Sequence, residues 1–334
     1  MKRASVPLLR RDFITVLGGA AAWRTSAWAQ QPEHIRRIGV LMDYSQADQF
    51  AESLLKAFRE RLESFGWSDG RNIYITYRWA AGDADRLRSY SAELAGLKPD
   101  VIFGRGTPVI AALRAATGSI PIVFVNANNP IGSGFIASMA RPGGNITGFV
   151  AFEPDMGGKW LQTLKEIEPK ITRVGLLYNP QSHTGQHFPS IELASPSLAM
   201  KIVRLPFYNA GGIERALGDY AVGSNAGILV MPDNSTNLHR DLIVRLATQY
   251  RLPAIYPFRQ FMVAGGLACY GADEKDQSEK AAEYVNRILN GARPGDLPVQ
   301  FPTRFELVLN NKAAKAIGLA IPPTMLARAD EVID

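Results

Sequence analysis

Short apolar runs alternate with amphipathic stretches along most of the chain. The run "RIGVLM" (37–42) is typical of a buried strand, and "QFAESLLKAFRERLESFGW" (49–67) is typical of a helix. In the second stretch, apolar residues recur at three- and four-residue spacings, which is the period of one helix face. These apolar positions are Leu54, Leu55, Phe58, Leu62 and Phe65. The pattern predicts a strand followed by a helix that packs on a sheet.

The same alternation continues to about residue 270. Further strands are predicted at 72–79, 100–104, 120–126, 144–150, 173–179, 201–207, 227–232, 252–258 and 265–271. Helices are predicted at 83–97, 107–117, 212–221 and 237–250, and in part over 184–200, where Pro189 and Pro196 are expected to break the helix. Strands that alternate with helices favour parallel sheets covered by helices on both faces.

Four of these elements recur in the same order. "RIGVLMDYSQ" (37–46) is echoed by "RVGLLYNPQS" (173–182), and the next three matches follow at offsets of roughly 120–136 residues. We therefore predict an α/β fold of two similar doubly wound parallel-sheet lobes joined by a hinge. The linkers are expected around 149–155 and 271–276. The lobes would comprise residues 35–150 with about 274–298, and residues 151–273 with about 299–334.

The first 29 residues are typical of a secretory signal peptide. Basic residues are followed by the apolar run Phe13–Trp23 and by "AWA" (27–29), a small–x–small processing site. The apolar run is too short to cross a bilayer, because a membrane-spanning helix needs about 20 residues. "RRDFI" (10–14) resembles the twin-arginine export signal, and an ordinary Sec signal is the alternative. Either signal predicts an exported protein that is soluble in a periplasm.

Removal of this leader changes the charge of the chain. The leader holds five of the 37 basic residues and one of the 31 acidic ones, which leaves 32 and 30 and a net charge of +2. A nearly balanced chain without a basic run gives no electrostatic reason to expect nucleic acid. The single cysteine, Cys269, lies in an apolar stretch, so an intrachain disulfide or a cysteine-based metal cluster is excluded.

Long ordered stretches of the chain resemble one family. They include "GWSDGRNIYITYRWAAGDADRL" (66–87), "IPIVFVNANNPIGSGFIASMARPGGNITGF" (120–149), "GGKWLQTLKEIEPKITRVGLLYNP" (157–180) and "FELVLNNKAAKAIGL" (305–319). With these stretches the chain is similar to ABC-transporter substrate-binding proteins of the type I periplasmic-binding-protein fold, in the branch with tryptophan- and tyrosine-binding relatives. The resemblance covers residues 35–333. It implies a hinged receptor that captures a small solute and delivers it to an inner-membrane ABC permease.

The chain departs from this family at positions where a ligand would bind. Many relatives carry Asp-Pro after the fourth strand, whereas this chain has Asn129-Pro130. The loops "DYSQADQF" (43–50) and "NPQSHTGQHF" (179–188) also differ. The family likeness therefore leaves the solute open, and a ligand ammonium could be met by Asp233, Asp43 or Glu153.

In the first lobe, the candidate ligand-binding residues follow strand ends, because ligands of open α/β sheets bind outside the carboxyl ends of the strands. Thr107 opens a helix whose free N–H groups favour a carboxylate, and its alternative role is that of an N-cap. Asn126 and Asn128 offer amide donors and acceptors, or serve the turn before Pro130. Tyr44 and Ser45 follow the first strand, where a ring can cover an apolar solute.

The second lobe offers a matching set of candidates. Asn179 and Ser182 follow the strand that echoes the first one, and a neighbouring His183 is expected to be solvated. Asp233 and Asn234 end another strand, where Asp233 is suited to a ligand ammonium or to an N-cap near Asn237. Two further candidates, Tyr256 and Tyr270, close later strands and have core positions as their alternative.

These residues favour a periplasmic solute-binding protein of an ABC importer over an enzyme. The chain lacks a G-x-S-x-G elbow, a Gly-Lys-Ser/Thr phosphate loop and HExxH, and we predict no catalytic residue, metal or cofactor. The expected solute is a small amino-acid-like or aromatic-acid molecule, bound by a monomer whose lobes close on it. An enzyme on a doubly wound fold, or a sensory module for a membrane receptor, is the alternative.

Overall fold

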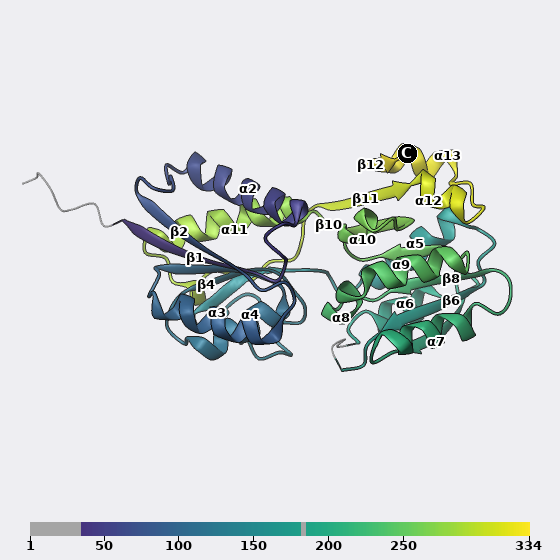
Figure 1. Ribbon diagram of the computed structural model, residues 1–334, viewed down its shortest axis with the longest axis horizontal. Coiled ribbons are helices and arrows are strands. Elements are labelled where there is room, and N and C mark those ends of the chain that lie inside the picture. The colour runs from purple at the N-terminus through teal and green to yellow at the C-terminus, as the bar shows by residue number, and fades with distance from the viewer. Residues whose placement is uncertain (1–34, 182–184) are drawn as a thin grey trace, which may run out of the picture.

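The computed structural model describes residues 35–181 and 185–334, and these form two α/β lobes side by side (Figure 1). The predicted signal peptide at 1–29, as well as Ser182 and His183, lies outside the described residues. The predicted fold class of two mainly parallel-sheet lobes is confirmed. No helix in the described part of the chain is long and apolar enough to span a membrane.

The first lobe contains a five-stranded sheet in the order β2-β1-β3-β4-β5, in which every neighbouring pair is parallel. Its strands are β1 (Arg36–Met42), β2 (Ile73–Trp79), β3 (Val101–Arg105), β4 (Ile122–Ala127) and β5 (Ile146–Val150). Helices α2 (Gln49–Ser64) and α11 (Glu274–Leu289) cover one face, and α3 (Ala84–Gly96) and α4 (Thr107–Ala116) cover the other. Each face therefore has its own apolar core.

The second lobe contains a seven-stranded sheet in the order β12-β11-β10-β9-β8-β6-β7. Its strands are β6 (Arg173–Tyr178), β7 (Lys201–Pro206), β8 (Ala226–Val230), β9 (Ala254–Tyr256), β10 (Ala268–Ala272), β11 (Phe305–Asn310) and β12 (Glu331–Ile333). β10 and β11 are antiparallel, whereas the other pairs are parallel. The antiparallel pair was not predicted, and it arises because β11 enters this sheet directly from the first lobe.

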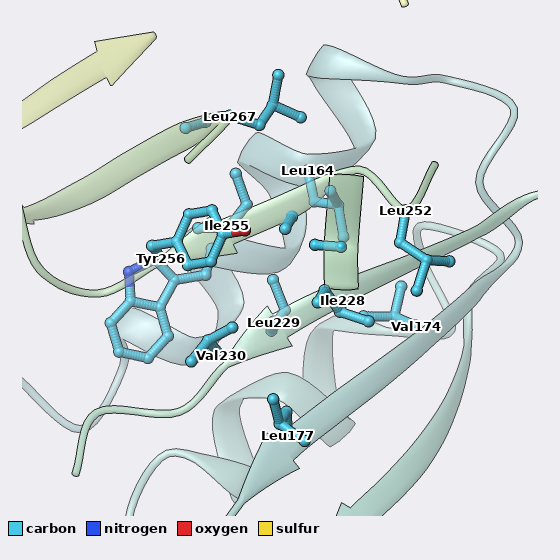
Figure 2. Packing of buried hydrophobic residues seen from close by; sticks show 14 of the residues in the cluster. Leu164, Val174, Leu177, Ile228, Leu229, Val230, Leu252, Ile255, Tyr256 and Leu267 are labelled. Atoms are coloured by element: carbon cyan, nitrogen blue, oxygen red, sulfur yellow. The ribbon is translucent and has the colours of Figure 1, made fainter. Parts of the chain in front are cut away.

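Helices of the second lobe pack on both faces of its sheet. They are α5 (Met156–Ile167), α6 (Phe188–Ala194), α7 (Ala210–Tyr220), α8 (Asn234–Leu238), α9 (Arg240–Gln249), α10 (Gln260–Val263), α12 (Asn311–Ala316) and α13 (Pro323–Arg328). Figure 2 shows part of the core, where Leu164 from α5 meets Ile228 and Ile255 from the sheet. Helices cover both faces of the sheet, so the side chains on both sides of each strand are buried. For this reason the strand sequences are continuous apolar runs.

Two predicted helices differ from the structure in their limits. Pro189 is the second residue of α6, where its missing N–H removes no helical hydrogen bond, so it opens the helix that it was expected to break. The helix predicted at 237–250 begins earlier and divides into α8 and α9 at His239.

The chain passes between the lobes three times. The crossings lie between Val150 and Met156, between Ala272 and Glu274, and between the short 3₁₀ helix η1 (Pro294–Asp296) and Phe305. The crossings pair with one another, because Val150 N–H donates to Gln300 O at 3.0 Å and Asp273 N–H donates to Arg304 O at 3.1 Å. The limits 35–150 with 274–298 and 151–273 with 299–334 remain our proposal for the two lobes.

Cys269 lies in β10 and is 3% exposed, and burial raises the pKa of its thiol above the usual range. Because the thiolate is the reactive form, we expect the native protein to react very slowly with a disulfide reagent at pH 8. Unfolding in guanidinium chloride should release one thiol per chain, measured by absorbance. Rapid reaction of the native protein would contradict the buried position of β10.

Candidate functional site

A cavity of about 250 Å³ lies between the lobes, at the carboxyl ends of strands from both sheets. The first lobe contributes Asp43, Arg105, Gly106, Thr107, Pro108, Ala111, Asn126, Asn128 and Ser133. The second lobe contributes Asp233, Asn237, Phe258 and Gln260. This position follows from the topology, since the loops after parallel strands gather at one edge of each sheet.

The loop between β3 and α4 forms one wall of the cavity. Gly106 is the N-cap of α4 with a φ of 90°, a conformation that L side chains rarely adopt. A Cβ at this position would also lie 3.0 Å from Asp43 Oδ2. Thr107 is the first helical residue, so its predicted alternative role as the N-cap is wrong. The first turn of α4 carries no acidic residue, and its N–H groups suit an anionic group of a solute.

The hydroxyl of Thr107 connects this wall to the end of β4. Its Oγ1 accepts a hydrogen bond from the backbone N–H of Asn128 at 2.9 Å. The side chain of Asn128 in turn reaches the second lobe, where its Nδ2 donates to Pro232 O at 3.4 Å. Asn128 therefore joins the two lobes across the cavity.

A buried ion network forms the floor of the cavity in the first lobe. Arg105, which is 2% exposed, donates from Nη1 to both carboxylate oxygens of Asp43 at 3.0 and 3.1 Å. Its Nε donates to Glu274 Oε2 at 2.8 Å, and its Nη2 lies 2.7 Å from the same oxygen. The guanidinium carbon also lies 4.4 Å from the centre of the Tyr44 ring. One cation thus meets two carboxylates and an aromatic face.

Burial and charge act in opposite directions on these groups. Burial is the largest single effect on Arg105 and disfavours the charged guanidinium, but Glu274, Tyr44 and Asp43 together outweigh it, so the pKa of Arg105 is raised and the group stays protonated. For Glu274, burial raises the pKa, while Arg105 and a hydrogen bond from Asn126 oppose the rise. Asn126 has a φ of 56° at the end of β4, and this backbone conformation places it between the cavity and Glu274.

Two amide side chains of the cavity wall have an oxygen that lacks a donor within the described part of the protein. They are Asn128 Oδ1 in the first lobe and Gln260 Oε1 in the second. Gln260 is 4% exposed, and its Nε2 donates to Asn237 Oδ1 at 3.0 Å. A buried acceptor without a donor costs about 1–3 kcal/mol, so a solute or water that supplies donors to these amides is favoured.

Asp233 lines the cavity from the second lobe and also caps a helix. Its Oδ1 accepts from Thr236 N–H at 2.8 Å in a capping box, and its Oδ2 accepts from Asn179 N–H at 3.4 Å. The helix that it caps, α8, starts at Asn234, earlier than expected from the sequence. The predicted N-cap role of Asp233 is therefore confirmed, and the same carboxylate also lines the cavity.

The structure brings Thr107, Asn126, Asn128 and Asp233 together around the cavity, but it places several other predicted residues elsewhere. Tyr44 is packed beneath Arg105, and Ser45 is exposed beyond it. Asn179 turns away to donate from Nδ2 to Ser235 Oγ at 3.0 Å. Asn234 opens α8, and Ser182 lies outside the described residues.

The two predicted second-lobe tyrosines also lie away from the cavity. The Tyr256 ring stacks on Phe261 at 4.9 Å in the core, and burial raises the pKa of its hydroxyl. Tyr270 lies beside Phe305, and its carbonyl accepts from Trp160 Nε1 at 2.6 Å. Alternate residues of a strand point to opposite faces of the sheet, toward the covering helices. Both rings therefore point to a face of the sheet and not toward the cavity at the strand ends.

Sequence reasoning missed Arg105, Asn237, Phe258, Gln260 and the buried Glu274. Arg105 had a recognisable signal, since a charged residue directly after the apolar run "VIFG" must find a partner when its strand is covered on both faces. The others come from separate loops that only the folded chain brings together. Within residues 35–181 and 185–334, no group of three or more potential ligands has the arrangement of a metal site.

Comparison with known proteins shows the family to which the chain belongs. The family model "ABC transporter substrate binding protein" matches residues 48–333. A tyrosine-binding protein of Clostridioides difficile (strain R20291) is 26% identical over 290 residues, which span 85% of this chain and 81% of the relative.

Among solved structures, a conserved domain protein of Vibrio cholerae has a TM-score of 0.78 and 26% identity, and covers 89% of this chain and 99% of its own. A Streptococcus protein in complex with L-Trp has a TM-score of 0.79 and 22% identity over the same shares. The chain therefore belongs to the ABC-transporter substrate-binding proteins. Its family is one of binding proteins, and the prediction that it is not an enzyme is confirmed on that basis.

Because of the ion network, we expect the loss of Arg105 to lower the free energy of unfolding more than the loss of a surface arginine. Arg105→Met leaves two buried carboxylates without their cation and should lower the free energy of unfolding by about 3–5 kcal/mol. Arg78→Met removes a surface pair with Glu93 and should cost less than about 1 kcal/mol. Urea unfolding measures both losses, and equal values would contradict a structural role for the network.

Proposed function

We propose that this protein is the periplasmic receptor of an ABC importer and captures a small amino-acid-like or aromatic-acid solute between its lobes. The observation that carries this proposal is the cavity itself, which is walled by strand-end loops of both lobes and spanned by the contact from Asn128 to Pro232. A solute in this position contacts both lobes only when they are closed, and so favours the closed form.

The groups around the cavity match the parts of such a solute. The first turn of α4 offers N–H groups to a carboxylate. Asp43 and Asp233, together with the oxygens of Asn128 and Gln260, accept hydrogen bonds from an ammonium group. Phe258 supplies an aromatic face. A micromolar dissociation constant corresponds to about −8 kcal/mol, which several such contacts can supply without covalent chemistry.

The relatives support an aromatic amino acid as a first candidate. One relative is named for tyrosine binding, and one structure of the same fold holds L-Trp. The cavity of about 250 Å³ is close to the lower end of the usual range for small-molecule sites, about 300–1,000 Å³. A single amino acid or aromatic acid suits this size better than an oligosaccharide or peptide.

The remaining parts of the proposal concern cellular context. The leader at 1–29 supports export, preferably by the twin-arginine route, and cleavage after Ala29 would release the receptor into the periplasm as a monomer. Its partner would be an inner-membrane permease, and the three paired crossings between the lobes would serve as the hinge.

A thermal-shift screen of amino acids and aromatic acids tests the solute class. Protein freed of bound solute by unfolding and refolding should be stabilised by at least one compound, by about 2.7 kcal/mol at a concentration 100 times the dissociation constant. If no member of the panel raises the melting temperature, the proposed solute class is wrong.

Gln260→Met tests the contribution of the second lobe to binding. Loss of an acceptor for a charged donor should weaken the bound solute by about 10- to 100-fold, measured by calorimetry with the best compound of the screen. Gln162→Met is a matched control, because Gln162 is exposed on α5 and bonds only to Glu166 in the described structure. An unchanged affinity in the Gln260 variant would show that this residue does not contribute to binding of the solute.

A further inference from the structure

Glu274 touches the solute cavity only through its neighbours. It is the first residue of α11, directly after the second crossing between the lobes, and its carboxylate is buried behind the cavity wall. Its partners are Arg105 and Asn126, and both of these line the cavity. Glu274 itself does not line it.

Carboxylates outnumber cations around the cavity, and Glu274 adds to this excess. Arg105 is the one basic side chain in the wall of the cavity, as far as the described residues show. It is already paired with Asp43, so the carboxylate of Glu274 adds a second negative charge to a single cation. Asp233 contributes a further carboxylate from the opposite lobe. The cavity therefore has a negative field in which a positive group of a solute is favoured.

We propose that Glu274 is a positioning residue that determines the charge preference of the site by keeping Arg105 from acting as an anion receptor. This inference rests on the proposed function of the cavity. With Glu274 in place, the guanidinium donates Nε to Glu274 and Nη1 to Asp43, and its Nη2 lies 2.7 Å from the same Glu274 oxygen. Two carboxylates therefore offset its single positive charge, which weakens its attraction for a solute carboxylate. Solutes with an ammonium group are then selected over those that carry only a carboxylate.

The substitution Glu274→Gln isolates this charge effect. A glutamine oxygen can still accept from Arg105 Nε, and Asp43 and the Tyr44 ring continue to hold the guanidinium in place. The cation keeps its position but loses half of its negative partners. Its positive charge then becomes available to an anionic solute in the adjacent cavity.

Three compounds that share one ring separate the alternatives: tyramine, L-tyrosine and 3-(4-hydroxyphenyl)propionate. By calorimetry at pH 7.5, the wild-type protein should bind the two amine-bearing compounds more tightly than the acid. In Glu274→Gln, the ratio of the affinities for the acid and for tyramine should rise by about 10- to 100-fold, because one unit of negative charge is removed near the site. Glu274→Asp should retain the wild-type preference.

A control substitution on the same helix concerns a residue that, in the described part of the chain, does not contact the residues of the cavity wall. Glu283→Gln removes a carboxylate that pairs with Arg61 at the surface, and it should leave the ratio unchanged. The double variant Arg105→Gln/Glu274→Gln removes one charge of each sign and should return the ratio toward that of the wild type. Asp43→Asn should shift the ratio in the same direction as Glu274→Gln. This second variant tests the inference if Glu274→Gln does not fold.

The outcomes distinguish this inference from the proposed function. A wild-type preference for the acid, or an unchanged ratio in folded Glu274→Gln, overturns the role of Glu274 while the receptor function stands. Equal weakening of all three compounds shows a purely structural role and also overturns it. If the wild-type protein binds none of the three and no member of the wider panel, the proposed function fails and this inference fails with it.

Discussion

The structure depends on one constraint of parallel sheets, namely that the loops after the strands gather at a single edge. Each lobe follows this constraint separately, and the chain places the two edges face to face. A site between these two edges can be assembled from many short loops, each of which contributes one or two side chains. None of these loops has to change the core of its own lobe in order to change the site.

The position of the cavity at the strand ends explains why charged residues are found so deep in the first lobe. Arg105 ends a strand whose other residues are fully covered, and a lone cation there would be strongly disfavoured. Asp43, directly after β1, and Glu274, the first residue of α11, compensate it, so that two strand ends and the first turn of a helix are joined by one group. Because Glu274 directly follows a crossing between the lobes, this network links the cavity floor to that crossing.

Several side chains that line the cavity also have a structural role. Asp233 caps α8 and lines the cavity, and Thr107 accepts a hydrogen bond from Asn128 while it opens α4. Asn128 then contacts the opposite lobe. Such shared roles hold the groups in place before a solute arrives, which lowers the ordering cost of binding.

The sequence alone determined the fold class and the positions of most strands and helices, because apolar periodicity and strand–helix alternation are local properties. It also placed Thr107, Asn126, Asn128 and Asp233 at strand ends that share one edge of a sheet, and the structure brings these four residues to the cavity. Tertiary structure alone decided that β11 runs antiparallel to β10, that Tyr256 faces the core, that Gln260 lines the cavity, and that Glu274 contacts Arg105 behind it. These features depend on contacts between segments far apart in the chain, such as the 169 residues that separate Arg105 from Glu274. No local pattern of residues encodes the partner of a buried charge.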